Sequence, residues 1–291
     1  MTNCIVLRCG STEVADSWVT MLAGSDVYLI VSFYNSDSYE AFTVMNEQSV
    51  SKHLWIGGKW TGIYDALCSK ELSHEYYFFP DDDITLGLQE VEALFEQMKA
   101  LGAEVGQPSL SHDSYFSHLI TLHHPGLIWR KTNFVEVMVP CLSSLLLRKV
   151  LPIFETTESG FGLDYVWCMY KDSFDKAYIF DSIQVCHTRP IGTHLAKAMK
   201  EQGRPMDSDE WRVLNQYFGI SGKQIPLVEL MLTDRGTVVG NRLLRVVCIW
   251  WSLRGECANR GLLDYKVDLR RYLKRQLLRV RSRYLQEVDS F

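Results

Sequence analysis

Short apolar runs alternate with amphipathic segments along the first two-thirds of the chain. Residues 4–7 and 27–33 are almost continuously apolar, as in buried strands, and residues 13–22 between them have the spacing of a helix. A strand, a helix and a second strand in this order predict a parallel sheet.

The rest of the chain extends this α/β pattern and then becomes helical. From residue 227 onward the pattern is entirely helical, and the Gly and Pro residues of GISGKQIP precede it. We therefore predict an α/β domain over residues 1–222 and a helical, basic region over residues 223–291. The other predicted elements are a loop over 35–50, helices over 60–67, 85–101 (ended by Gly102), 143–155 and from 160, strands over 76–79, 133–142 and 176–187, an irregular stretch over 103–132, and one or two helices within 193–218.

Composition narrows the class of protein. The 291 residues are 47% hydrophobic and 22% charged, as in soluble globular proteins, and no apolar run is long enough for a transmembrane helix. The N-terminus lacks the basic start and long apolar stretch of a signal peptide. None of the cysteines forms a CxxC pair that would indicate a zinc site or a disulfide framework. We therefore predict a cytoplasmic protein.

Three consecutive aspartates, Asp81, Asp82 and Asp83, follow the aromatic strand in FFPDDDI. They fall between a strand and a helix, at the carboxyl edge of the predicted sheet, where open α/β sheets bind ligands. Three adjacent carboxylates repel one another, and a divalent cation such as Mn²⁺ or Mg²⁺ would offset their charge. A solvated turn or a helix cap also explains this string, although neither requires so apolar a strand before it.

Two later motifs supply further candidates. In GFGLD, Asp164 follows two glycines, where Gly162 lets the backbone approach a ligand and the carboxylate can serve as a general base. In VCHTRP, His187 ends a strand and could complement the aspartates on a metal ion. The ordinary alternatives are a helix cap for Asp164 and a polar strand end for His187.

Four more polar residues lie near predicted strand ends or inside a strand. Arg8 ends the first strand, Ser11 follows it, and Lys59 follows two glycines, so each is placed to reach a phosphate. A surface lysine beside a turn is the alternative for Lys59. Glu136 alternates with apolar neighbours in FVEVMV, and it therefore either faces solvent or lines a site.

Together these strings resemble a plant and bacterial family described only as a domain of unknown function. Its members share a KW segment, an acidic cluster after a strand, an F-V-E-[IV]-M-[AV]-P string, a G-[WF]-G-L-D string and a strand that ends in His, and the resemblance covers about residues 4–195. That family in turn resembles the GT-A nucleotide-sugar glycosyltransferases. The resemblance implies a GT-A-like, Rossmann-type mixed sheet flanked by helices.

The GT-A resemblance also implies roles for these side chains. Asp81, Asp83 and His187 would hold Mn²⁺ or Mg²⁺ on the donor diphosphate, and Asp82 would lie nearer the donor ribose or sugar. From their positions in the sequence, and not from the resemblance, Arg8, Ser11, Lys59 and Gly162 are the candidates for further contacts to the nucleotide-sugar donor.

The catalytic base of an inverting member would fall on Asp164. Leu163 stands where an acidic residue often precedes that base, which leaves acceptor binding open, and Glu136 is the candidate to replace it. The resulting prediction is a metal-dependent glycosyltransferase that acts on a glycan or glycolipid acceptor in bacterial surface polysaccharide or lipopolysaccharide synthesis. The alternatives are a sugar-phosphate transferase and a non-catalytic scaffold that binds nucleotide sugars or glycans.

Charge is distributed unevenly along the chain. The net charge is −5, but residues 241–291 hold twelve Lys or Arg against five Asp or Glu, which leaves −12 on the remaining 240 residues. Residues 242–255, with Trp250 and Trp251, and residues 268–285 predict basic helices with apolar stripes. We predict contact with an anionic inner-membrane surface; the alternative is that these stripes pack on the catalytic domain or a second subunit. Nucleic acid is not expected, because the body is acidic and no known binding motif is present.

Overall fold

The computed structural model describes residues 2–44, 46–170, 175–190, 212–217, 225–254 and 265–278 of the chain. The strands are β1 (Asn3–Cys9), β2 (Val27–Phe33), β3 (Val50–Leu54), β4 (Tyr76–Phe78), β5 (Ile84–Thr85), β6 (Val105–Leu110), β7 (Leu127–Thr132), β8 (Cys141–Ser143), β9 (Ala177–His187), β10 (Val228–Thr233) and β11 (Val238–Val239). The helices are α1 (Thr12–Met21), α2 (Ser36–Ala41), α3 (Lys59–Leu67), α4 (Leu88–Leu101), α5 (Ser144–Phe154), α6 (Leu163–Val166), α9 (Arg242–Leu253) and α10 (Tyr265–Leu278), with a 3-10 turn η1 (Leu119–Thr121) and a π-helical turn η2 (Arg212–Tyr217). Among the described helices, none has the combination of length and hydropathy that crossing a bilayer requires.

One mixed sheet of 11 strands runs through the described residues in the order β11-β10-β7-β9-β6-β8-β4-β1-β2-β3, with β5 paired to β9 off this path. The strands β1, β2, β3 and β4 are parallel to one another, and so are β6 and β9. The antiparallel β8 stands between β4 and β6, so these two strands point the same way. The carboxyl ends of the parallel strands therefore meet at one edge of the sheet, where ligands bind in open α/β folds.

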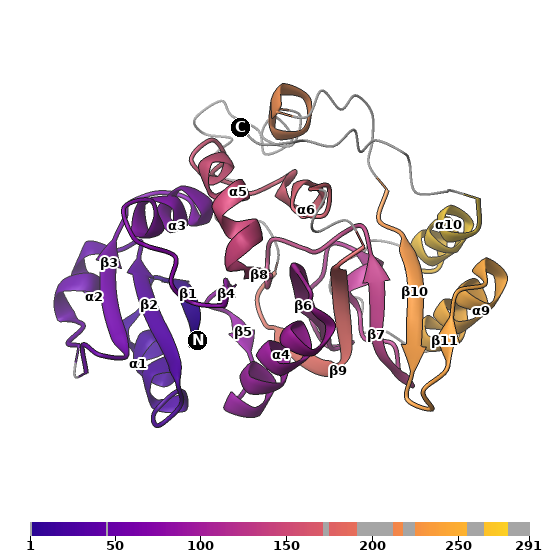
Figure 1. Cartoon of the computed structure of the whole chain (residues 1–291), viewed down its shortest axis with the longest axis horizontal. Helices are drawn as coiled ribbons and strands as arrows, with labels where there is room; N and C mark the ends of the chain where they lie inside the picture. The colour runs from indigo at the N-terminus through magenta and orange to yellow at the C-terminus, as the bar shows by residue number, and fades with distance from the viewer. Residues whose placement is uncertain are drawn as a thin grey trace.

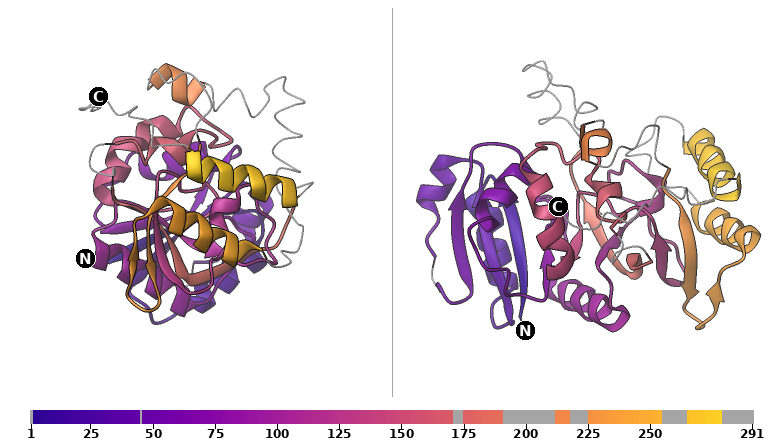
Figure 2. Two further views of the ribbon diagram at one scale, coloured as in Figure 1. Left: turned by 90° about the vertical axis from the view of Figure 1, so that its right-hand side faces the viewer. Right: turned by 45° about the horizontal axis from the view of Figure 1, so that its top comes forward.

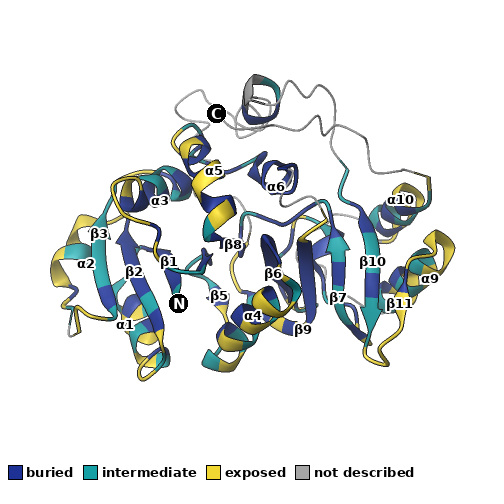
Figure 3. Cartoon of the chain, viewed as in Figure 1, coloured by how far each residue is buried: buried dark blue, intermediate teal, exposed yellow. Residues whose placement is uncertain are grey.

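Helices cover this sheet from two sides (Figure 1). In that view α3, α5 and α6 gather above the sheet and α1 and α4 below it, while α9 and α10 close the right-hand end. The strands β4 and β6 are buried along their whole length, and the exposed residues lie on the outer faces of the helices and in the loops (Figure 3). The predicted fold class, a Rossmann-type mixed sheet flanked by helices, is confirmed.

The elements on either side of the aspartates follow directly from their sequences. The aromatic side chains of β4 are buried in the core, and α4 ends at Gly102, which adopts the left-handed conformation with φ 55°. The buried face of α4 consists of Val91, Leu94, Phe95 and Met98. The aspartates therefore lie between a buried strand and an amphipathic helix, as predicted.

The predicted strand over residues 133–142 is wrong for most of its length. Its backbone N–H groups bond to distant side chains: Glu136 donates to Oε1 of Gln107 at 2.5 Å, and Val137 donates to Oδ1 of Asp164 at 2.7 Å. Residues 133–140 therefore form a loop, and strand structure resumes at Cys141. The apolar, β-branched composition favoured a strand, but side chains of other elements, and not a neighbouring strand's backbone, accept these hydrogen bonds.

Two stretches that we predicted to be irregular contain regular structure. The predicted loop over 35–50 contains α2 and the first residue of β3, and the stretch over 103–132 contains β6 and β7. Polar side chains obscured the pattern of β6 and β7, because these strands carry buried polar residues that find partners inside the fold. They include Gln107, Ser109, Arg130 and Thr132.

The region after residue 223 is not entirely helical, contrary to the prediction. Strands β10 and β11 form an antiparallel hairpin, and β10 pairs with β7 in the main sheet. The chain turns between them at Gly236, whose φ of 75° suits a glycine. The helices α9 and α10 then follow. The domain boundary near residue 222 stays a prediction, and residues 191–211, 218–224 and 279–291, on which further predicted helix falls, lie outside the described residues.

Candidate active site

The carboxyl edge of the sheet brings together residues from distant parts of the sequence. Gly10 follows β1, Tyr34 follows β2, the three aspartates follow β4, and His187 ends β9. The short strand β5 pairs with the end of β9, placing Ile84 opposite His187. This pairing fixes the aspartates beside the histidine.

Asp81, Asp83 and His187 form a group that could hold a metal ion. One oxygen from each carboxylate and one ring nitrogen all lie within 4.8 Å of one another. Nε2 of His187 lies 3.1 Å from Oδ2 of Asp83, and Nδ1 lies 2.9 Å from the carbonyl of Tyr115. When that carbonyl accepts a hydrogen bond from Nδ1, the neutral ring carries its lone pair on Nε2, which a cation would bind in place of the present contact with Asp83.

Two basic side chains already contact these carboxylates. Nζ of Lys59 lies 2.5 Å from Oδ1 of Asp81 and also donates to the carbonyls of Phe79 and Val137. Arg189 donates from Nε to Oδ2 of Asp83 at 2.9 Å and from Nη2 to Oδ1 of Asp82. The repulsion among the three carboxylates is therefore offset here by the protein's own cations.

The pKa values of the ion pair between Asp83 and His187 are shifted in opposite directions. Burial alone would raise the pKa of Asp83, but the hydrogen bonds and charges of His187 and Arg189 hold it below its ordinary value. Burial likewise disfavours the charged form of His187, but the hydrogen bond and charge of Asp83 outweigh it and raise the pKa of the imidazole. Asp83 is thus held in the ionised form that a metal ligand requires.

Val137 connects the aspartates to a second acidic group. Its carbonyl accepts from Nζ of Lys59 at 2.9 Å, and its N–H donates to Oδ1 of Asp164 at 2.7 Å. Asp164 is buried in the first turn of α6, a helix of 4 residues that begins after Gly162, whose φ is 98°. The motif GFGLD therefore starts a helix as predicted, but a shorter one than expected.

Glu136 is buried beside this group and keeps one oxygen, Oε2, without a hydrogen-bond partner. Burial raises the pKa of Glu136 well above its ordinary value, and the negative charges of Asp164 and Asp81 raise it further. The neutral carboxylic acid is therefore favoured. Glu136 is not in a strand, so strand alternation does not explain its burial. Its side chain lies inside the protein because the loop 133–140 folds over the sheet edge.

Asp82 faces the ends of β1 and β2. Its Oδ2 accepts from the hydroxyl of Tyr34 at 3.1 Å and from the N–H of Gly10 at 3.4 Å. Ser11, which follows Gly10 in the sequence, caps α1, and its Oγ accepts a hydrogen bond from the N–H of Val14. Asp82 therefore lies on the side of the group nearest the first strands.

Arg8 lies beneath this edge, where backbone carbonyls hold its guanidinium. Nη1 donates to the carbonyl of Phe33 at 3.0 Å, and Nη2 donates to the carbonyls of Trp55 and Gly57 at 3.0 and 2.8 Å. Burial lowers the pKa of Arg8 to about 10. In this structure Arg8 links β1 to β2 and to the loop before α3, and its contact with a phosphate stays a prediction.

A cavity of about 300 Å³ adjoins the aspartates. It lies between α1 and the acidic group and is lined by Asp82, Asp83, Thr188 and apolar side chains of α1, among them Trp18. A larger hollow of about 590 Å³ lies at the opposite edge, near the amino ends of β1 and β2, and includes Glu75 and Glu92. The smaller cavity is the one next to the candidate metal group, because Asp83 lines it.

Three residues of this edge were not predicted. Arg189 comes two residues after His187 and could have been suspected from that spacing, and Tyr34 could have been suspected because it directly follows a predicted strand. Gln107, which positions Glu136, carried no such signal because it lies in the middle of β6.

Comparison with known proteins gives a distant structural likeness. No protein-family model and no curated protein matches the chain, so the family suggested by the motifs stays a prediction. Two solved structures of S. aureus TarS, residues 1–349, resemble it, one free and one in complex with UDP-GlcNAc. The free form has a TM-score of 0.46 and 12% sequence identity, and the match covers 75% of this chain and 72% of TarS 1–349. The complex has a TM-score of 0.45 and 11% sequence identity, and the match covers 76% of this chain and 74% of the TarS chain. Both TM-scores are low, and the fold class rests on the strand order and directions described above.

Proposed function

We propose that the chain is a metal-dependent glycosyltransferase of the GT-A type, which moves a sugar from a nucleotide-sugar donor to a glycan or lipid-linked acceptor. The main support is the convergence of Asp81, Asp83 and His187 at the carboxyl edge of a mixed α/β sheet. Asp164, in the first turn of α6, and Glu136, on the loop 133–140, lie next to this group, so the proposed site combines possible metal ligands with carboxyl groups suited to proton transfer.

The donor set fits Mn²⁺ or Mg²⁺. Two carboxylates and one imidazole offer hard oxygen and nitrogen ligands, and their atoms already converge. When bound, such a cation supplies Lewis-acid stabilisation of the negative charge on a leaving diphosphate. Asp82, Tyr34 and the backbone of Gly10 then offer polar contacts for the donor at the ends of β1 and β2.

Asp164 is the base in this proposal. It removes a proton from the acceptor hydroxyl, and the N–H of Val137 orients its carboxylate by holding Oδ1. Glu136, favoured in its neutral form and with Oε2 unpartnered, is placed to hydrogen-bond an acceptor hydroxyl. A base beside the acceptor corresponds to an inverting reaction. The motif resemblance and the basic C-terminal helices favour an acceptor from bacterial surface polysaccharide or lipopolysaccharide synthesis.

The test is a thermal-shift screen of nucleotide sugars with and without Mn²⁺, followed by assays of donor hydrolysis and transfer. We expect one donor to raise the melting temperature only when Mn²⁺ is present, because a ligand that binds the folded state stabilises it. Asp83→Asn should lose this shift and all turnover. The matched control is Asp234→Asn, an exposed aspartate in the turn between β10 and β11, which should behave as wild type.

The same screen separates the alternatives. Release of a nucleoside monophosphate together with transfer of a sugar phosphate would identify a sugar-phosphate transferase. Binding of a nucleotide sugar without turnover under any condition would identify a scaffold. A protein that neither binds nor turns over any nucleotide sugar with Mn²⁺ would overturn the proposal.

A further inference from the structure

Exposed large hydrophobic side chains gather at one end of the described part of the molecule. Tyr34, Ile56 and Leu145 are the exceptions, which lie elsewhere. The others are Leu243, Leu244, Val247, Trp250 and Trp251 of α9, with Val238 of β11 and Leu278 of α10. Single exposed hydrophobic residues are normal on a protein surface, but a contiguous set on one helix indicates a contact site.

Helix α9 is apolar on two opposite faces. Ile249 and Leu253 are buried, and the helix packs against α10 and β10. The outward face carries Leu243, Val247 and Trp250 at helical spacing, and Leu243 is 64% exposed. A helix that packs on its own protein with one face normally turns polar residues to the solvent. The outward face of α9 is therefore built to be covered.

Basic residues lie at the same end of the molecule as this apolar face. Helix α10 lies beside α9 at the same end of the molecule (Figure 2, left panel), and Nη1 of Arg242 donates to the carbonyl of Leu277 at 3.2 Å. The guanidinium of Arg254 lies 3.3 Å from the centroid of the Trp251 ring. Within residues 242–254 and 265–278, Asp268 is the single acidic residue. The basic ones are Arg242, Arg245, Arg254, Lys266, Arg270, Arg271, Lys274 and Arg275.

We propose that the outward face of α9, with the basic residues of α9 and α10, docks on an anionic lipid surface. An apolar band with tryptophans and flanking arginines suits the boundary between headgroups and acyl chains, where aromatic rings and long basic side chains are both stabilised. Anionic headgroups complement the positive charge of the two helices.

Charge also decides between a lipid surface and a second copy of the chain. Pairing two of these faces would bring two strongly positive surfaces together, which is unfavourable. On an anionic membrane, by contrast, the net charge of −12 on residues 1–240 is repelled, so the acidic body is held away from the lipid while the two helices are attracted. The inference goes beyond glycosyl transfer, and its test does not depend on activity.

The test is sedimentation of the full chain with vesicles of phosphatidylcholine, with or without phosphatidylglycerol. We expect wild type to sediment with the anionic vesicles and to be released as salt screens the headgroups. Leu243→Ser combined with Leu244→Ser should weaken this binding by roughly tenfold or more, because two leucines no longer enter the lipid. The matched control is Leu145→Ser on α5, since Leu145 is 60% exposed, close to Leu244 at 58%.

Each other outcome overturns the proposal. Equal binding of wild type and the double variant to anionic vesicles would show that the apolar face of α9 does not contact the lipid. Failure of wild type to bind anionic vesicles, together with a dimer in sedimentation equilibrium that the double variant loses, would assign the face to a second copy. Failure to bind vesicles without self-association would exclude lipid as the occupant.

Discussion

Arg189 and His187 contact the same oxygen of Asp83. Nε of Arg189 lies 2.9 Å from Oδ2 of Asp83, and Nε2 of His187 lies 3.1 Å from it. The guanidinium also reaches Asp82. A divalent cation bound by Asp81, Asp83 and His187 would use this same carboxylate, so Arg189 is positioned as its competitor.

The first prediction concerns this competition. Arg189→Gln should bind Mn²⁺ more tightly than wild type in the absence of any nucleotide, because a positive charge that opposes the cation has been removed. At a partly exposed site the gain should be roughly tenfold in Kd, equivalent to about 1.4 kcal/mol. Titration calorimetry with MnCl₂ measures it. Arg235→Gln, an exposed arginine in the β10–β11 turn, is the matched control and should leave the Kd unchanged. An unchanged or weaker Kd for Arg189→Gln would show that Arg189 and the cation do not compete.

The position of the aspartates could be predicted because local signals agree there. The aromatic run of β4 and the amphipathic face of α4 both point to a sheet edge at Asp81–Asp83, and the apolar alternation of β9 places His187 at a strand end. Each signal lies within about twenty residues of the side chain it places.

The rest of the site depends on contacts between distant segments. Residues 133–140 have the composition of a strand, but contacts from elsewhere in the chain, among them the side chains of Gln107 and Asp164, hold them as a loop over the sheet edge. Arg189 is a 52% exposed side chain whose role follows from the position of β9 beside the aspartates. No local pattern of residue types encodes either arrangement.

The second prediction separates donor binding from transfer. Asp164→Asn keeps an oxygen that can accept from the N–H of Val137, so the loop should retain its conformation. The Asn amide cannot take up the proton of the acceptor hydroxyl, so we expect the transfer rate to fall by roughly 10²- to 10⁴-fold. Donor affinity, measured by calorimetry with Mn²⁺, should stay near wild type. Transfer at the wild-type rate would remove Asp164 as the base.

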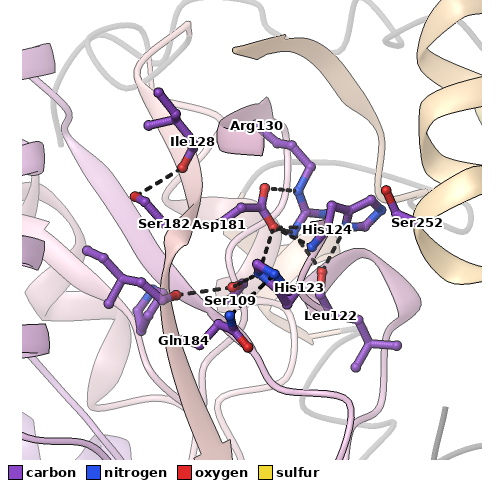
Figure 4. A network of polar contacts seen from close by, with 12 residues as sticks. Ser109, Leu122, His123, His124, Ile128, Arg130, Asp181, Ser182, Gln184 and Ser252 are labelled. Carbon is purple, nitrogen blue, oxygen red and sulfur yellow. Dashed lines mark hydrogen bonds and ion pairs between the residues drawn. The ribbon is translucent and has the colours of Figure 1, made fainter. Parts of the chain in front are cut away.

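The third prediction concerns a buried ion pair under the basic helices. Arg130 and Asp181 are fully buried, with Nε of Arg130 2.7 Å from Oδ2 of Asp181 and Nη2 2.9 Å from Oδ1 (Figure 4). Asp181→Asn would leave the guanidinium buried without a counter-charge, at a cost of about 3–5 kcal/mol in the free energy of unfolding. Urea denaturation at neutral pH measures this loss.

The matched control for Asp181→Asn is the same substitution in an exposed pair. Asp65 lies 2.9 Å from His53 and its side chain is 46% exposed, so Asp65→Asn should cost no more than about 1 kcal/mol. Similar losses for the two variants would mean that water reaches the pair between Arg130 and Asp181.

The fourth prediction is an acid sensitivity that originates in His123, a neighbour of this pair. Its Nδ1 lies 3.4 Å from Oγ of Ser109, and its ring faces Gln184 (Figure 4). Burial, together with the positive charges of His112 and Arg130, lowers the pKa of His123 to about 4. In the folded protein the ring is therefore neutral until the solution is strongly acidic.

The sign of the pH effect follows from proton uptake. In the unfolded chain His123 binds a proton near its ordinary pKa of 6.5, so between that value and about 4 unfolding takes up a proton and the free energy of unfolding falls as the pH falls. The full effect of this one residue is about 3 kcal/mol. The variant His123→Asn lacks this titrating group. Its free energy of unfolding, measured by urea denaturation, should therefore fall less between pH 7 and pH 4.5 than that of wild type. Some slope should remain, because burial also lowers the pKa of His124 well below its ordinary value. Parallel curves for variant and wild type would mean that His123 is already protonated in the folded state.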